Sequence, residues 1–245
     1  MRLIRAKNYD DMSLKAANII AAQVSLNPKS VLGLATGSTP IGTYRHLVEW
    51  YQKGELDFGK AVSINLDEYC GLSGDHPQSY RRFMRENLFD HINIPADRSF
   101  LPDGTQTDSA LECARYDRII EEYNGIDLQL LGIGRNAHIG FNEPDSCFAC
   151  GTHQVTLTES TIAANTRFFE NEAQVPRQAY SMGMQAIMQA KRVLLIASGA
   201  DKAEAIRNSF FGPVTPQVPA SILQLHRDVI VIADEAALAD CPAEA

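Results

Sequence analysis

One stretch of the chain combines an expected buried strand with side chains that can transfer protons. Residues 127–133 form an apolar run of the length and composition typical of a strand in a parallel sheet. Two glycines then allow a close turn, and Asn136, His138 and Glu143 follow in the same segment. His138 can move a proton near neutral pH, and Glu143 can orient it or stabilise its cationic form. Because open α/β sheets keep their ligand sites at the carboxyl ends of strands, this stretch is a candidate catalytic loop. The alternative is a polar loop in which both side chains only bond to the backbone.

A pair of neighbouring carboxylates follows another apolar run. Residues 61–66 are expected to form a strand, and Asp67 and Glu68 come directly after it. Successive side chains of an extended segment point in opposite directions, so only one of the two carboxylates should face a ligand at this edge. Asp67 could instead serve to turn the loop that follows.

The segment after residues 30–35 is suited to hold an anion. It contains Gly37, Ser38 and Thr39 and leads into a helix. Ser38 or Thr39 can cap that helix, and Pro40 suits its first turn. Backbone N–H groups, hydroxyls and the helix dipole would then all point at the ligand. The segment lacks the lysine and the glycine spacing of a Walker A loop, and an ordinary helix cap would have the same sequence.

A lysine near the start of a later helix also favours an anionic ligand. Lys202 follows the apolar run 192–197 and a Ser-Gly turn. A cation at a helix amino terminus opposes the helix dipole unless an anion is present. The alternative is a single solvated lysine.

Expected strands and helices alternate along the chain. Apolar runs typical of strands occupy residues 30–35, 61–66, 127–133, 155–157, 192–197 and 228–233. Helical patterns occupy residues 10–26, 41–51, 79–91, 107–123, 176–190 and 219–225, another helix begins just before Lys202 and runs through Phe211, and a final short helix is expected in the tail. Residues 164–174 are polar and are expected to be mobile. The alternation predicts a single α/β domain, residues 1–245, with a mostly parallel sheet and helices on both faces.

The composition excludes several classes of protein. The chain has 245 residues, of which 45% are hydrophobic, enough for one substantial core. Its formal net charge of −8 argues against a nucleic-acid partner or a membrane surface, although a local cluster of donors could still bind a small anion. No apolar run approaches the ~20 residues of a membrane span, and the first residues do not resemble a secretory signal.

Five cysteines with irregular spacing point to a reducing compartment. Cys147 and Cys150 form a lone CxxC pair without the further ligands of a zinc site. A redox role for this pair is the less favoured alternative. We therefore expect free thiols and a cytoplasmic protein.

The candidate segments together resemble the glucosamine-6-phosphate deaminase family. The resemblance rests on Gly-Ser-Thr-Pro at 37–40, Leu-Asp-Glu-Tyr at 66–69, Gly-Ile-Gly-Arg-Asn-Ala-His-Ile-Gly-Phe-Asn-Glu-Pro at 132–144, Ala-Asn-Thr-Arg-Phe-Phe at 164–169 and Ser-Ile-Leu-Gln-Leu-His at 221–226. It implies a Rossmann-like fold and an aldose–ketose isomerisation coupled to loss of ammonia, in amino-sugar catabolism. Glucosamine 6-phosphate and water would give fructose 6-phosphate, without a metal or an organic cofactor.

The same resemblance implies roles for the proton-transferring residues. Asp67 matches the base that removes the C2 proton of the open-chain sugar. His138, positioned by Glu143 and Asn136, matches the group that opens the sugar ring. Some members carry Asp where this chain has Asn136. An amide cannot exchange a proton, so Asn136 can only hydrogen-bond, and ring opening falls to His138 and Glu143.

The resemblance also implies the anion contacts. Ser38 and Thr39, with the loop amides from Gly37 onward, match phosphate and substrate contacts, as do Arg167 and Lys202. An arginine and a helix terminus together form a suitable clamp for a dianion. Arg167 lies in the segment that resembles the lid of the family, whose closure would exclude water.

Three other functions remain open from the sequence. A 6-phosphogluconolactonase would share the fold, but those proteins tend to continue His-Thr-Ala-Ser-Leu-Phe-Pro after the histidine, whereas this chain has His-Ile-Gly-Phe-Asn-Glu-Pro. A galactosamine-6-phosphate deaminase would differ only in pocket contacts. A sugar-phosphate-sensing regulator would need a DNA-binding domain, for which the residues before Asp10 leave no room.

The sequence also predicts hyperbolic kinetics without allosteric activation. Some relatives are hexamers activated by N-acetylglucosamine 6-phosphate, which they hold through basic residues in a stretch like Arg-x-Lys-Thr-Leu. Here the stretch begins with His153 and has Val155 in place of the lysine. Valine has neither charge nor donor. We expect a monomer or small homo-oligomer without activation by this compound.

Overall fold

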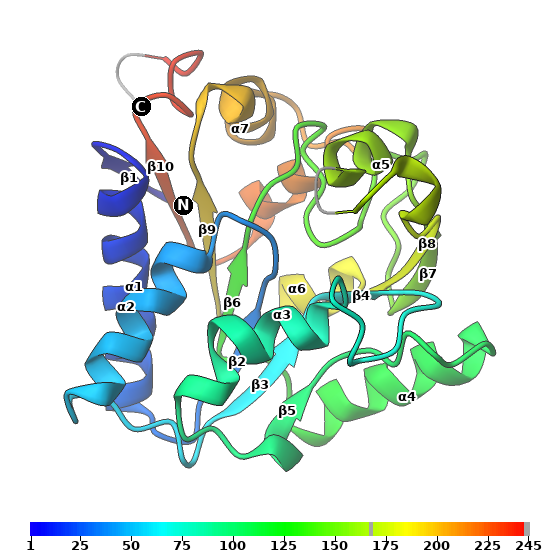
Figure 1. Cartoon of the computed structure of the whole chain (residues 1–245). Helices are drawn as coiled ribbons and strands as arrows, with labels where there is room; N and C mark the ends of the chain where they lie inside the picture. The colour runs from blue at the N-terminus through cyan, green and yellow to red at the C-terminus, as the bar shows by residue number, and fades with distance from the viewer. Residues whose placement is uncertain (167–168, 243–245) are drawn as a thin grey trace.

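Seven parallel strands form the central sheet of the protein (Figure 1). The computed structural model describes residues 1–166 and 169–242. Across the sheet the strands run in the order β1 (Arg2–Ala6), β10 (Val229–Asp234), β9 (Arg192–Ala197), β6 (Leu128–Leu131), β2 (Val31–Leu34), β3 (Val62–Asn65) and β5 (Ser99–Phe100). Each of these pairings is parallel, so the carboxyl ends of the strands meet at one edge.

Helices cover the sheet and connect its strands. They are α1 (Tyr9–Leu26), α2 (Ile41–Gln52), α3 (Tyr80–Asn87), α4 (Ser109–Glu122), α5 (Glu159–Asn165), α6 (Met184–Gln189) and α7 (Ala203–Phe211), and a 3-10 helix spans Pro219–Leu225. In Figure 1 α1 and α2 lie together on one side of the sheet, and α4 lies on the other. This arrangement confirms the predicted α/β class with a mostly parallel sheet and helices on both faces.

A second, three-stranded sheet stands beside the carboxyl edge of the first. It is antiparallel and consists of β4 (Asp67–Tyr69), β8 (Gln178–Ser181) and β7 (His153–Thr156). The two sheets join at Leu66. Its N–H donates to the Leu34 carbonyl at 3.1 Å, and its own carbonyl accepts from the Met182 N–H at 2.7 Å. The chain thus leaves the large sheet after β3 and enters the small sheet at Asp67.

Two buried tyrosines fasten the strand ends beside this junction. The hydroxyl of Tyr44, on α2, donates to the Ala35 carbonyl, and that of Tyr116, on α4, donates to the Asn65 carbonyl, each at 2.5 Å. Ala35 and Asn65 lie at the ends of β2 and β3, where the candidate site begins. Both tyrosines are fully buried, so these two strand ends are held from opposite sides of the sheet.

The prediction of a helix over residues 176–190 was wrong in its first half. Gln178–Ser181 is the middle strand of the small sheet and pairs with both β4 and β7. These pairings join segments far apart in sequence and override the local helical spacing. A Cβ at Gly183 would lie 2.1 Å from the carbonyl of Cys150, so the chain can pass there only as glycine, and the helix begins at Met184.

The other differences from the predicted elements are smaller. β1, which pairs with β10, was not predicted, and residues 235–240 form turns and not the expected short helix. The helix expected over residues 79–91 ends at Asn87 and is followed by a 3-10 turn. Of the segment expected to be mobile, residues 167 and 168 lie outside the described residues.

Two further observations concern the chain as a whole. Among the helices of the described part, none combines the length and apolar character needed to cross a lipid bilayer. The five cysteines are all free thiols, as predicted.

Candidate active site

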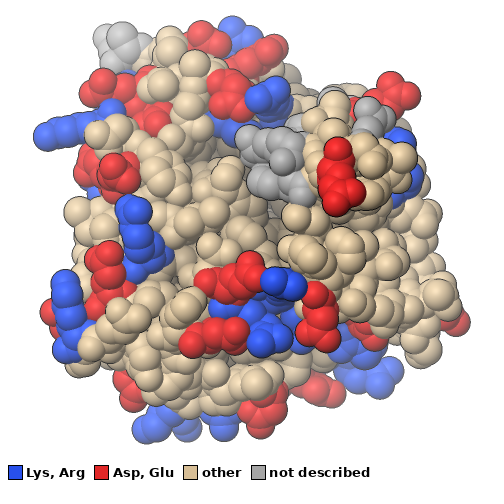
Figure 2. All heavy atoms as spheres, viewed as in Figure 1, with Lys and Arg blue, Asp and Glu red and all other residues tan. Residues whose placement is uncertain are grey.

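A cavity of about 1010 Å³ lies at the carboxyl edge of the central sheet. Its floor and one wall come from the segments that follow β2, β3, β6 and β9, four adjacent strands. Its other wall comes from α3, α5 and the small sheet. Figure 2 shows this face hollowed near its centre, with charged side chains gathered over α3 at the lower rim. There Arg82 pairs with Glu86, and Arg85 pairs with Asp75 and Asp90.

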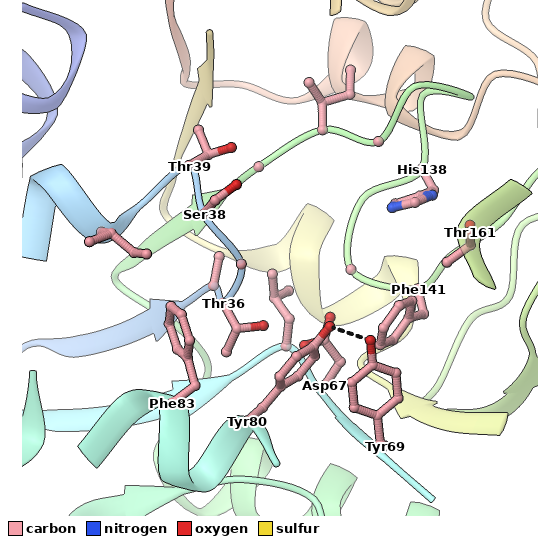
Figure 3. Close-up of a pocket in the computed structure, with 18 of the residues that line it drawn as sticks. Thr36, Ser38, Thr39, Asp67, Tyr69, Tyr80, Phe83, His138, Phe141 and Thr161 are labelled. Carbon is pink, nitrogen blue, oxygen red and sulfur yellow. Dashed lines mark hydrogen bonds between the residues drawn. The ribbon is translucent and has the colours of Figure 1, made fainter. Parts of the chain in front are cut away.

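The cavity collects most of the residues that the sequence singled out. Those lining it are Gly37, Ser38, Thr39, Asp67, Asn136, His138 and Lys202. In Figure 3 Ser38 and Thr39 lie on one side, His138 lies on the opposite side, and Asp67 lies at the floor between them. Glu143 stands behind His138 and lines a separate cavity of about 350 Å³. Arg167 lies outside the described residues.

The two neighbouring carboxylates have different surroundings, as their alternation on a strand predicts. Asp67 lines the cavity, while Glu68 points toward the start of α3. The Glu68 carboxylate accepts hydrogen bonds from the N–H groups of Tyr69, Tyr80 and Arg81, each at 2.9 Å. Glu68 therefore satisfies the amino end of a helix, and Asp67 is left to face a ligand.

Asp67 is held in a state that favours its protonated form. The residue is 6% exposed, and within the described structure its Oδ1 atom is buried without a hydrogen-bond partner. Burial, followed by the charge of neighbouring Glu68, raises the pKa of Asp67 to about 8, although a hydrogen bond from Thr36 opposes the shift. A raised pKa in a carboxyl group that lines a cavity is typical of a general acid or base.

His138 and Glu143 form a pair on the opposite side of the cavity. Nδ1 of His138 lies 3.4 Å from Oε2 of Glu143. The amide of Asn136 donates to the same Glu143 oxygen at 2.6 Å, and its carbonyl accepts from the His138 N–H at 3.3 Å. Asn136 thus contacts both members of the pair, through the carboxylate of Glu143 and the backbone of His138.

The backbone before His138 follows a tight turn. A Cβ at Gly134 would lie 2.4 Å from the His138 ring, so only glycine allows the ring to pack there. The next turn residue, Ala137, has a φ of 65°. This left-handed conformation costs a residue with a Cβ about 1–2 kcal/mol. Strain of this kind concentrates at functional sites, and here it points the imidazole into the cavity.

The end of the cavity that is expected to bind an anion is built on the loop after β2. Gly37 has a φ of 89°, which turns the chain toward the cavity. The expected cap of α2 by Ser38 or Thr39 is not made, because Pro40 occupies the N-cap position without a side-chain cap hydrogen bond. The hydroxyl of Tyr9 instead accepts from the Gly42 N–H at 2.8 Å. Both loop hydroxyls therefore line the cavity and do not close the helix.

Among the described residues, two cations border the end of the cavity beside this loop, and one of them was not predicted from the sequence. Lys202 occupies the N-cap position of α7, at the end of a 3-10 turn. Its Nζ lies 3.8 Å from Asp201, and the same carboxylate accepts from Nε of Arg135 at 2.9 Å. Arg135 lines the cavity as well. Its position within the catalytic loop was the only signal that could have identified it.

Aromatic side chains form the remaining wall. The Tyr80 hydroxyl donates to that of Tyr69 at 3.3 Å, and the ring of Phe141 stacks on Tyr80 with centroids 6.0 Å apart (Figure 3). Tyr80 and Phe83, both on α3, line the cavity and were not among the predicted site residues. Thr161, on α5, also lines it and was not predicted.

The described residues contain no cluster of three or more His, Cys, Asp and Glu side chains of the kind that holds a metal. The cavity offers a carboxyl group, a histidine–carboxylate pair and a cationic end with two hydroxyls. Together these groups can bind a small anionic molecule by its charged end and transfer protons to and from the part of that molecule that lies farther from the charge.

The fold and this cavity define a Rossmann-like α/β protein whose site lies at the carboxyl ends of parallel strands. A family model described as glucosamine-6-phosphate isomerases/6-phosphogluconolactonase matches residues 6–232. The chain belongs to this family.

Individual relatives are similar over their full lengths. A glucosamine-6-phosphate deaminase from Lachnoclostridium phytofermentans is 61% identical over 232 residues, covering 95% of this chain and 98% of the relative. One from Clostridioides difficile is 56% identical over 237 residues, covering 97% and 95%. The solved structure of a monomeric glucosamine-6-phosphate deaminase has a TM-score of 0.96 and 45% identity, covering 98% of this chain and 100% of that one. A 6-phosphogluconolactonase from Leishmania guyanensis, with a TM-score of 0.75, 20% identity and 99% coverage of both chains, shares the fold.

Proposed function

We propose that the protein converts glucosamine 6-phosphate and water into fructose 6-phosphate and ammonia, as a step of amino-sugar catabolism. The observation that carries the proposal is the placement of Asp67 and the His138–Glu143 pair around one cavity, with Ser38 and Thr39 at its far end. An isomerising deaminase needs two separate proton-transfer groups and an anion site. The relatives at 61% and 56% identity are both named glucosamine-6-phosphate deaminase.

The phosphate is placed at the end formed by the loop after β2. Ser38 and Thr39 offer hydroxyls, and Lys202 offers a cation held against Asp201. Arg167, from its place in the sequence motif, is assigned to the same phosphate. Charge-assisted hydrogen bonds to a dianion are strong and directional, so this end fixes how the sugar lies. C1 and C2 then lie toward His138 and Asp67.

Ring opening is the first chemical step. His138 accepts the proton of the C1 hydroxyl and delivers a proton to the ring oxygen, which breaks the bond from C1 to that oxygen and leaves a C1 aldehyde. Histidine is cationic partway through this exchange, and the Glu143 carboxylate 3.4 Å away stabilises that form. Asn136 holds the carboxylate in place but carries no proton itself.

Isomerisation and loss of ammonia follow. The aldehyde makes the C2 hydrogen acidic. Asp67 removes it while the C1 oxygen takes a proton from the ammonium group on C2, which gives a neutral enolamine across C1 and C2. Asp67 then returns the proton to C1, leaving an imine at C2. Water adds to C2, ammonia leaves, and the ketone remains. Because burial raises the pKa of Asp67 to about 8, the ammonium group of the bound amino sugar would favour the carboxylate form that acts as the base.

Two other members of the same family provide alternatives that one experiment separates. The purified protein is given glucosamine 6-phosphate, galactosamine 6-phosphate or 6-phosphogluconolactone, with and without a chelator, and ammonia and ketose phosphate are measured. We expect both products from glucosamine 6-phosphate, with or without the chelator. Lactone hydrolysis without ammonia release would replace the proposal, and a preference for the galactose epimer would change the substrate.

We further propose that the protein acts as a monomer, which is the narrower part of the range expected from the sequence. The relative of known structure at 45% identity is described as monomeric. Light scattering during size-exclusion chromatography should give a mass near 27.0 kDa. A mass of twice that value or more would show that the chain assembles.

A further inference from the structure

Thr161 lies against the His138–Glu143 pair, although no sequence motif assigns it a role. It is on the first turn of α5 and is 5% exposed. Its hydroxyl donates to Oε1 of Glu143 at 2.5 Å. Figure 3 shows Thr161 on the same side of the cavity as His138. A residue from outside the catalytic loop therefore reaches the carboxylate that orients the histidine.

The Glu143 carboxylate is held at both of its oxygens. Asn136 donates to Oε2, which also faces His138, while Thr161 donates to Oε1. Burial alone would raise the pKa of Glu143. The His138 contact, followed by the hydrogen bonds from Thr161 and Asn136, outweighs burial and lowers the pKa below the ordinary value. Since Asn136 and Thr161 are neutral, they stabilise the negative charge without cancelling it.

The direction of the Thr161 hydroxyl is fixed by a third residue. Oγ1 of Thr158 donates to Oγ1 of Thr161 at 3.1 Å. A hydroxyl has a single proton, so Thr161, while accepting from Thr158, donates its own proton to Glu143. Thr158 is also the N-cap of α5 and accepts from the Thr161 N–H. The start of α5 thus sets the geometry of the hydrogen bond to Glu143.

We propose that Thr161 is a positioning residue for ring opening, which keeps Glu143 ionised and aimed at His138. The proposal rests on the proposed function, because it concerns the same reaction. Thr161 transfers no proton to or from the sugar. Its effect is exerted on the His138–Glu143 pair and should be absent from the later step at Asp67.

The test compares variants that separate the hydroxyl from the shape of the side chain. Thr161→Val keeps the branched shape and removes the donor, while Thr161→Ser keeps the donor. A hydrogen bond to a charged group is worth about 10-fold or more in rate, so we expect Thr161→Val to lower kcat at least about 10-fold with KM changed less than about 3-fold. Thr161→Ser should stay within about 3-fold of the parent in both. Thr43→Val is the matched control, since Thr43 is buried and its hydroxyl bonds to the Ser13 carbonyl at 3.4 Å, away from the pair.

Two further readouts distinguish positioning from general damage. Loss of the Thr161 donor should raise the pKa of Glu143, and the carbon resonance of the Glu143 carboxyl should report this shift. An analogue without the C4 and C5 hydroxyls, which can close into neither a furanose nor a pyranose, should be turned over equally well by the parent and by Thr161→Val.

Each outcome supports or overturns the proposal. An unchanged kcat or an unchanged Glu143 resonance in Thr161→Val, failure of Thr161→Ser to restore activity, or an equal loss on the analogue would each overturn it. Should Thr161→Val lack a cooperative thermal transition, Thr161→Ala is measured in its place with the same expectations. If the parent protein releases no ammonia from glucosamine 6-phosphate, the proposed function fails. The Glu143 resonance then still tests whether Thr161 keeps that carboxylate ionised.

Discussion

Replacing Asp67 with asparagine should stabilise the folded protein at neutral pH while removing its turnover. The pKa of Asp67 is about 8 in the folded state, against an ordinary carboxyl value in the unfolded chain. The folded state therefore binds this proton more tightly. The stability that this preference contributes is fully present below about pH 4 and is lost as the pH rises to about 8. A pH of 7 lies about three units above the pKa of the unfolded chain, and each unit corresponds to about 1.4 kcal/mol. The stability lost at pH 7 is therefore about 4 kcal/mol.

An amide at this position stays neutral at every pH. Asp67→Asn should avoid the loss of about 4 kcal/mol. Burying an amide that lacks partners should cost about 1–2 kcal/mol, so the free energy of unfolding should rise by about 2–3 kcal/mol at pH 7. Urea unfolding of both proteins at several pH values measures this difference. The difference in free energy of unfolding should widen by about 3 kcal/mol from about pH 5 to about pH 7.5. The exposed Asp97→Asn should show no such widening.

Two results would refute this reasoning. A stability difference that stays constant with pH would mean that Asp67 is not forced to keep its proton by the fold. Near-normal release of ammonia by Asp67→Asn, where loss of a general base should cost at least ~10²-fold, would remove Asp67 as the C2 base. Exchange of solvent deuterium at C2 should fall together with turnover.

The remaining predictions concern the other parts of the site. His138→Gln should impair turnover of the cyclic substrate much more than that of an analogue that cannot form the ring, and equal impairment would place His138 in a later step. Lys202→Ala and Arg167→Ala should each raise KM for the 6-phosphate sugar while thermal unfolding stays unchanged, and an unaltered KM would remove that residue from the phosphate site. With His153 and Val155 in place of basic residues, saturation curves should be hyperbolic with and without N-acetylglucosamine 6-phosphate, because the lost phosphate contacts exceed the ~1–3 kcal/mol of a typical allosteric coupling. A sigmoidal curve that this compound makes hyperbolic would contradict the last prediction.

Five of the seven strands of the central sheet were predictable because they carry their signal locally, whereas β1 and the short β5 at its two edges were not predicted. Buried parallel strands such as β6 and β9 are continuous apolar runs, and the turns after them hold the polar residues of the site. The small sheet was not predictable in the same way. β8 is a strand only because β4 and β7 lie on either side of it, and Tyr180 within it fits a helical pattern as well as a strand.

The residues of the candidate site also divide into those with a local signal in the sequence and those whose role depends on contacts between distant segments. Strand alternation predicted that only one of Asp67 and Glu68 would face a ligand, and the structure places the two side chains on different sides. The choice of Asp67 came from the resemblance to the family. Thr161 and Arg135 were missed because their importance depends on what they meet in space. Thr161 reaches Glu143 across 18 residues, and Arg135 reaches Asp201 across 66 residues. No spacing rule for a single helix or strand anticipates such contacts.

The passage of the chain between its sheets at Leu66 has a consequence for the length of the substrate. Ser38 and Thr39 extend from the large sheet, while Asp67 is the first residue of the small one. If the phosphate of a hexose phosphate lies at this first pair and its C2 at Asp67, as proposed above, the sugar spans the junction between the two sheets. A pentose phosphate held at the same hydroxyls has one carbon fewer between its phosphate and C2, so we expect it not to reach the carboxylate. In the proposed mode of binding, the site therefore selects the number of carbons between the phosphate and the reacting centre before the configuration of any hydroxyl.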